Sequence, residues 1–178
     1  MLVVLRKYDT AIAFVCGALI VAFIAAAFTV PSFWDWLWQR HQNQLSWYIR
    51  PLFLIPLCWF AYKRSGAGIM ATVLLLLTSM GWFPPPRQVS PRVQQFLQFE
   101  QQYLRGDWTS GKVLFTVMVP LSLAALAAAL WRRNLWLGLA VMALIAIAKT
   151  LWSVAFAGEA GASVIVPAAL GLLLCSGG

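Results

Sequence analysis

Long apolar runs are the feature that most restricts what this chain can fold into. The first is an almost uninterrupted stretch from Ala11 to Val30. A stretch of about 20 apolar residues is long enough to cross the hydrocarbon core of a bilayer as one α-helix. Inside lipid, backbone polar groups must be satisfied within the segment itself, which favours helices. Similar runs recur along the sequence, so it predicts an all-α, polytopic membrane bundle.

The composition supports this interpretation. The chain has 178 residues, of which 62% are hydrophobic and 10% are charged. A soluble domain is typically about 45–50% apolar and about 25% charged. A soluble fold of this size could not hide so much apolar surface and still keep a polar coat.

Basic residues exceed acidic ones, with 13 Lys and Arg against 5 Asp and Glu. They lie beside the apolar runs, so we interpret them as orientation signals and as contacts with anionic or amphiphilic lipids. No nucleic-acid module is expected.

About six transmembrane helices are predicted within one membrane domain, residues 1–178. Their approximate ranges are 10–33, 47–62, 66–83, 113–131, 135–157 and 160–175. Pro51 and Pro56 interrupt the second range, and the run from Pro84 to Pro86 ends the third. Arg6 and Lys7 precede the first range as in a signal peptide, but the apolar run exceeds the roughly 7–15 residues of a signal-peptide core. We therefore expect the first helix to be retained.

Basic pairs predict the orientation. Arg6-Lys7, Lys63-Arg64 and Arg132-Arg133 fall at every second boundary, and cytoplasmic loops are enriched in Lys and Arg. This alternation places both termini in the cytoplasm of a multi-pass cell-membrane protein, and we expect the bacterial inner membrane. The connection between the last two ranges carries Glu159 and no basic residue, as an outer loop should.

Two outer segments are predicted to form amphipathic interfacial helices, at about 34–45 and 91–104. In the first, the residues at helical spacing are Trp34, Leu37, Trp38, His41 and Leu45. In the second, the residues on one face are Val93, Phe96, Leu97, Glu100 and Leu104. Ser90 and Pro91 supply an N-cap and first-turn pair for the second helix, and Arg105-Gly106 resembles a C-terminal turn with glycine at C′.

Most polar and aromatic side chains are predicted on the outer face. Of the acidic residues, only Asp9 is expected on the cytoplasmic side. The outer aromatics are consistent with an ordinary interfacial belt or with a groove for an amphiphile such as a lipid, a polyprenyl carrier or a quinone. The outer basic residues, Lys112 among them, are likewise consistent with headgroup contacts or with a site for a phosphate-bearing lipid.

Lys149 is the main candidate ligand-binding residue. It lies within the fifth predicted span, roughly 12 Å below the outer boundary at about 1.5 Å per residue. Such a charge faces the bundle interior and finds a partner, or its stem snorkels outward. Trp152 and Phe156 share its helix face. The other candidate ligand-binding residues are Arg50, Glu100, Trp38 and Phe96.

Glu100 and His41 are weak candidates for catalysis. Each falls on the apolar stripe of its predicted helix, and Lys149 or Arg50 could pair with the carboxylate. Helix boundaries shifted by a residue or two would instead turn both groups to water. With a single histidine, scattered cysteines and no GxSxG or HExxH motif, we expect no metal site and no cofactor.

Three functions are consistent with these observations. The first is binding or transport of a lipid-like amphiphile through an outer-leaflet groove roofed by the interfacial helices. The second is a membrane enzyme acting on a lipid-like substrate at the same face. The third is a non-catalytic subunit of a larger membrane complex, and a homo-oligomer is also compatible with the sequence. The pattern favours a protein that is not an enzyme.

Overall fold

The computed structural model describes the backbone of residues 7–161 and the side chains of residues 7–148. Over this part of the chain the secondary structure is helical and contains no strand. This confirms the predicted all-α class. The chain divides into two compact units, Met1–Arg87 and Gln88–Gly178.

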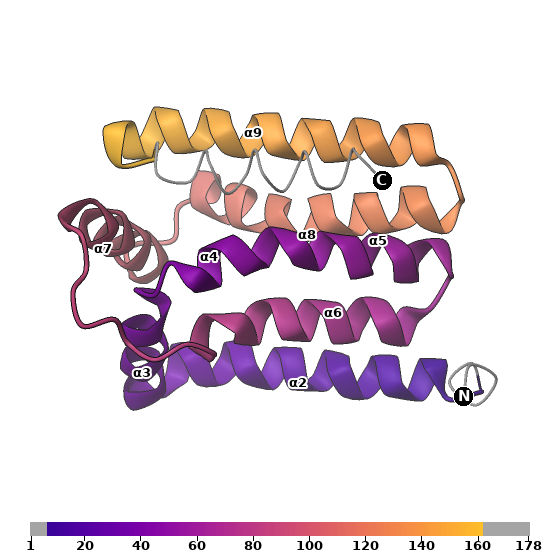
Figure 1. Ribbon diagram of the computed structural model, residues 1–178, viewed down its shortest axis with the longest axis horizontal. Coiled ribbons are helices and arrows are strands. Elements are labelled where there is room, and N and C mark those ends of the chain that lie inside the picture. Colours follow the sequence, from indigo (N-terminus) through magenta and orange to yellow (C-terminus); the bar gives the residue numbers. More distant parts are fainter. Residues whose placement is uncertain (1–6, 162–178) are drawn as a thin grey trace. The chain divides into compact units, whose positions relative to one another are not determined.

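The first unit packs two long apolar helices side by side. Its elements are α2 (Asp9–Thr29), α3 (Pro31–His41), α4 (Leu45–Ile49), η1 (Arg50–Phe53), α5 (Leu54–Tyr62), α6 (Gly66–Thr78) and η2 (Ser79–Gly81). Helix α6 packs against both α2 and α5, while α3 contacts the end of α2 and η2. Figure 1 shows α2 and α6 running in the same direction, with α3 turned across their far end.

The first predicted span, 10–33, ends earlier in the structure. Val30 adopts an extended conformation, with φ −109° and ψ 102°, and α3 begins at Pro31. The ring of a proline disfavours the helical conformation for the residue before it, which separates α2 from α3. The first amphipathic helix therefore spans 31–41 and not 34–45.

The second predicted span is a continuous path through three short elements. Helices α4 and α5 are joined by the 3₁₀ turn η1, which contains Pro51 near its start. Every described residue at these junctions keeps right-handed helical angles, so the chain bends without leaving the helical path. The third predicted span corresponds to α6 followed by η2.

A close approach between α5 and α6 requires a glycine. A Cβ atom added at Gly68 would collide with the Phe60 ring. Gly68 lies in the first turn of α6, and Phe60 lies in the last turn of α5. The small residue therefore lets the two helices meet directly after the turn between them.

The second unit contains α7 (Pro91–Arg105), α8 (Ser110–Trp131) and α9 (Leu135–Gly161). Helix α9 packs against both α7 and α8. Helix α7 matches the predicted range 91–104, and the Ser90 hydroxyl accepts a hydrogen bond from the Val93 N–H at 3.4 Å. The expected N-cap is therefore confirmed.

Helix α7 ends at Arg105, as the sequence predicts, but Gly106 does not form the predicted glycine turn. Gly106 has φ −70° and ψ 177°, an extended conformation and not a left-handed one. Its N–H still closes the last helical turn on the Gln102 carbonyl at 2.8 Å. The extended backbone presents the Gly106 carbonyl to the Lys112 ammonium, 2.6 Å away.

Helix α9 is longer than the fifth predicted span, 135–157. It continues through Gly158 and Glu159 to Gly161, so the residues expected in an outer loop are helical. The beginning of the sixth predicted span, 160–175, therefore falls inside α9. The rest of that span lies outside the described residues.

Two helices in the described part of the chain, α2 and α8, are long and apolar enough to cross a membrane. Segments Gly66–Gly81 and Leu135–Ala148 are apolar but shorter. In α2 and α8 alike, only 17% of the most apolar window is buried. Lengths and composition thus support two spans directly, and the six-span topology stays a prediction.

Asp9 ties the start of α2 to the start of α6. Its carboxylate accepts hydrogen bonds from the Ser65 hydroxyl at 2.6 Å, the Gly66 N–H at 2.8 Å and the Ala67 N–H at 3.2 Å. The N–H groups of a first helical turn have no intrahelical partner, and a negative charge is favourable there. One side chain thereby fixes two helices that are distant in sequence.

Replacing Asp9 with alanine should destabilise the first unit, because three donors lose a charged acceptor. We expect a loss of about 1–3 kcal/mol in the free energy of unfolding, measured by denaturant unfolding of the purified protein in detergent. Asp35→Ala is the matched control, since Asp35 is an exposed carboxylate on α3. It should change stability by less than about 0.5 kcal/mol, and an equal loss in both variants would contradict the anchoring role.

Candidate functional site

Four aromatic rings contact one another in a buried series where α3 meets α4, with their planes tilted or edge to face. Trp34, Trp38 and His41 follow one face of α3, and Trp47 returns from α4. Successive ring centroids lie 5.2 Å apart for Trp34–Trp38, 5.5 Å for Trp38–His41 and 5.7 Å for His41–Trp47. All four residues are buried. With the adjacent Arg50, they are called here the His41 cluster.

His41 contacts two neighbours, one through its backbone and one through its ring. The Trp47 indole N–H donates to the His41 carbonyl at 3.0 Å, and Arg50 Nη2 lies 3.4 Å from His41 Nδ1. A guanidinium can only donate, so the ring nitrogen can take part in this contact only as an acceptor.

The corner between α3 and α4 is built around Asn43. Its side-chain oxygen accepts from the Leu45 N–H at 3.1 Å, and its amide donates to the Pro84 carbonyl at 3.0 Å. The Ser46 hydroxyl, fully buried, donates to the Asn43 carbonyl at 2.9 Å. The proline-rich segment after η2 is thereby bound to the corner that holds the His41 cluster.

A second group of aromatic side chains in the first unit stays exposed. The Arg40 guanidinium lies over the Trp36 ring, 4.4 Å from its centroid, and Phe33 stacks on Trp36 at 5.7 Å. Trp36 also passes so near Gly81 that a Cβ there would lie 2.7 Å from the ring. Trp82, the next residue, meets Phe53 edge to face at 5.7 Å.

Trp36 and Trp82 are 42% and 47% exposed. Trp36, Trp82 and Arg40 are called here the aromatic rim. The rim combines flat apolar surfaces with a cation, so it can accept an apolar chain next to a negatively charged group.

In the second unit, Lys112 is enclosed by its own loop. The ammonium donates to the Gly106 carbonyl at 2.6 Å and lies 3.5 Å from the Asp107 carbonyl. It also lies 4.6 Å from the Trp108 ring centroid and 5.2 Å from that of Tyr103. Lys112 is only 8% exposed, so its ammonium stabilises the corner between α7 and α8.

The structure brings some of the predicted site residues together. Trp38, Arg50 and His41, inferred separately from the sequence, share the His41 cluster. Phe96 is buried on α7, and Glu100 is half-buried on the same helix of the second unit. The pairing of Glu100 with Lys149 or Arg50 stays a prediction.

Lys149, Trp152 and Phe156 lie on α9, but their side chains fall outside the described residues. Their predicted common face, and the cavity that they would line, therefore stay predictions.

Two features were missed in the sequence. The first is Asn43, which organises the α3–α4 corner. Asparagine often forms turns by bonding the backbone through its side chain, so this residue type was a signal for the corner. The enclosure of Lys112 had no local signal, because its two carbonyl partners depend on the extended backbone after α7.

Within the part of the chain whose side chains are described, no group of three His, Cys, Asp or Glu residues could hold a metal ion. Comparison of the chain with protein-family models, curated proteins and solved structures finds no match in any of the three. The site must therefore be interpreted from its own geometry.

Trp47→Phe removes one buried donor while keeping an aromatic ring, and should destabilise the His41 cluster. We expect a loss of about 1–3 kcal/mol in the free energy of unfolding, because the buried His41 carbonyl loses its partner. Trp82→Phe is the matched control, since it removes an exposed indole bond to the Thr78 hydroxyl at 3.3 Å. Equal effects in the two variants would contradict a structural role for the buried bond.

Proposed function

We propose that this chain is an integral membrane protein that crosses the bilayer about six times, and that it binds or transports a lipid-like amphiphile at its outer face. One observation carries the membrane assignment. The two helices that are long and apolar enough to cross a membrane, α2 and α8, consist mostly of exposed and half-buried residues, with only 17% of their most apolar windows buried.

A soluble core and a signal sequence can also contain long apolar helices, but both fit this chain less well. A core helix of a soluble protein buries its apolar side chains, whereas Phe14 is 75% exposed on α2 and Val119 is 63% exposed on α8. A signal sequence lies at the N-terminus, whereas α8 begins at Ser110. The bonds of Asp9 to the start of α6 also favour a retained α2.

The proposed orientation follows from the basic turns. Lys63-Arg64 joins α5 to α6, and Arg132-Arg133 joins α8 to α9. The positive-inside rule places both turns, and with them both termini, in the cytoplasm. A bacterial inner membrane is the simplest location for a protein with this arrangement.

The proposed amphiphile site is the aromatic rim. Trp34, Leu37 and Trp38 of the α3 stripe are buried, and so are Phe96 and Leu97 of the α7 stripe, so these faces are already occupied. Trp36 and Trp82 keep 42% and 47% of their surface exposed, and this exposed part is the surface that we propose for an apolar chain. Arg40, which lies over Trp36, is positioned to meet a polar or anionic end.

The same geometry does not favour catalysis by His41. Its Nδ1 faces the Arg50 guanidinium, and the residue is only 4% exposed. A general base needs to reach the proton that it removes. We therefore propose binding or transport as the function. The alternative, a membrane enzyme acting on a lipid-like substrate, would be established by turnover of such a substrate.

The membrane assignment predicts both extraction behaviour and topology. The protein should remain in the pellet when native membranes are washed with alkaline carbonate. A phosphatase that is active only outside the cytoplasm should be active when fused after Trp108 and inactive when fused after Asn134. Release by carbonate, or activity at both positions, would contradict the assignment.

The amphiphile proposal predicts selective effects in the aromatic rim. Native mass spectrometry of the detergent-purified protein with farnesyl phosphate and farnesol provides the measurement. Trp36→Leu and Trp82→Leu should each weaken binding of both probes about fivefold, since the smaller side chain buries less apolar surface against the chain, at about 25 cal/mol per Å². Arg40→Gln should weaken binding of farnesyl phosphate alone.

Trp136→Leu is the control, because Trp136 is an 82% exposed tryptophan on α9 that lies outside the rim. If all three tryptophan variants bind the probes like wild type, the rim is an interfacial belt and the site proposal is wrong. A partner that remains bound at fixed stoichiometry through mild detergent extraction would instead support a subunit of a larger complex.

A further inference from the structure

The turns between paired apolar helices have the same backbone geometry in both units. In the first unit, the Arg64 N–H bonds to the Ala61 carbonyl at 3.0 Å and the Ser65 N–H bonds to the Phe60 carbonyl at 2.9 Å. This pair of bonds, spanning three and five residues, defines the Schellman motif that closes a helix. Arg64 occupies the left-handed position, with φ 57°.

The turn of the second unit repeats this motif residue by residue. The Arg133 N–H bonds to the Leu130 carbonyl at 2.8 Å, and the Asn134 N–H bonds to the Ala129 carbonyl at 3.2 Å. Arg133 has φ 58°. Each unit therefore closes one apolar helix with a basic residue followed by a left-handed arginine.

The residue after each arginine starts the next helix. The Ser65 hydroxyl accepts from the Gly68 N–H at 3.1 Å, and the Asn134 side chain accepts from the Leu137 N–H at 3.0 Å. Both are favourable N-cap residues. Three residues thus complete each reversal through backbone bonds and a side-chain N-cap.

Arginine is an unfavourable choice for the left-handed position. Glycine has no Cβ penalty there, and asparagine also adopts this conformation readily. Backbone strain that persists at a residue indicates that something other than local stability selects it. Here the side chain brings a permanent positive charge with forked donors.

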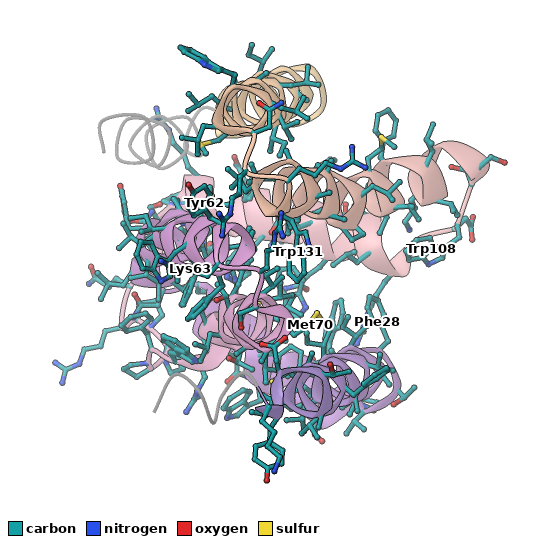
Figure 2. All side chains as sticks on the ribbon, turned by 90° about the vertical axis from the view of Figure 1, so that its right-hand side faces the viewer. Phe28, Tyr62, Lys63, Met70, Trp108 and Trp131 are labelled. Carbon is teal, nitrogen blue, oxygen red and sulfur yellow. The ribbon has the colours of Figure 1, made fainter. Side chains whose placement is uncertain are left out.

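The surroundings of both turns suit the boundary between a membrane and water. Lys63, Arg64, Arg132 and Arg133 are all exposed. The Lys63 ammonium lies over the Trp59 ring, 4.7 Å from its centroid, and Trp59 is 59% exposed. Figure 2 shows Lys63 and Tyr62 on the first turn, and Trp131 at the helix end before the second.

The N–H groups at the start of α6 already donate to the Asp9 carboxylate. They are therefore not the groups of the first turn that would bind another anion. Its exposed side-chain cations are the groups that can meet one. Tryptophan is enriched at headgroup depth, and each basic residue near an anionic membrane surface strengthens attraction to it.

We propose that each basic turn binds the headgroup of an anionic phospholipid. In each, the left-handed arginine and the basic residue before it donate to the phosphate, and the neighbouring tryptophan lies at the level of the acyl ester groups. This inference rests on the membrane location proposed above, but concerns the cytoplasmic ends of the helices and not the aromatic rim.

Arg64→Asn and Arg133→Asn test the proposal, because asparagine keeps the left-handed turn while removing the charge. The detergent-purified full chain is titrated with dioctanoyl phosphatidylglycerol and dioctanoyl phosphatidylcholine, and bound lipid is counted by native mass spectrometry. Wild type should prefer phosphatidylglycerol. Each variant should weaken one phosphatidylglycerol site about fivefold, with binding of phosphatidylcholine unchanged and no loss of thermal stability.

Arg87→Asn and Arg92→Asn are the matched controls, since each removes one exposed arginine from the same unit as its counterpart. Equal weakening by these controls would show a general charge effect and overturn the proposal, as would equal affinity of wild type for the two lipids. If an asparagine variant does not fold, Arg64→Gly and Arg133→Gly remove the same charges. Carbonate release would contradict the membrane location, whereas an integrated protein without lipid preference would contradict only this inference.

Discussion

Apolar surface that the helices leave exposed constrains everything else about this protein. Side chains such as Phe14 on α2 and Val119 on α8 have no protein cover over most of their surface. In water, large exposed apolar patches lead to association. A bilayer removes that penalty, but it also requires each spanning segment to satisfy its own backbone groups. Helix caps and corners then form at the ends of the helices.

The two kinds of helix end are built differently. The turns at Arg64 and Arg133 are three residues long and combine two backbone bonds with a side-chain N-cap, Ser65 or Asn134. In the first unit, Asp9 also binds the start of α6. The opposite ends hold side-chain networks, with Asn43 and the His41 cluster in the first unit and Lys112 in the second. Each unit also places an amphipathic helix, α3 or α7, before its turn-linked pair. This contrast is why we propose lipid headgroups at one end and an amphiphile at the other.

The sequence predicts the elements whose signals are local. Helix α7 can be located closely because Ser90 and Pro91 mark its start and its apolar residues recur at helical spacing. The end of α2 is harder to place because aromatic residues after Pro31 continue the apolar run, whereas the break depends on backbone sterics at Val30. Helix α9 passes through Gly158, since one glycine lowers helix propensity without ending a helix by itself.

The candidate site could be predicted only in part. Trp38, His41 and Arg50 can each be identified in the sequence, but the contacts that join them depend on the fold of the α3–α4 corner. The left-handed positions are hidden because arginine stands where glycine is the usual signal. Lys112 resembles the other outer cations, and only its enclosure by Gly106, Tyr103 and Trp108 distinguishes it.

Lipid contact on α8 tests the membrane assignment most directly. A spin label is attached at Val119→Cys in full-length protein that carries Cys16→Ala, Cys58→Ala and Cys175→Ala, reconstituted in liposomes. Electron paramagnetic resonance then compares its collisions with oxygen, which enters lipid, and with a polar nickel chelate, which does not. A label at Asp107→Cys serves as the aqueous reference. A lipid-facing Val119 predicts high oxygen and low nickel accessibility, and high nickel accessibility or protection from both reagents would contradict it.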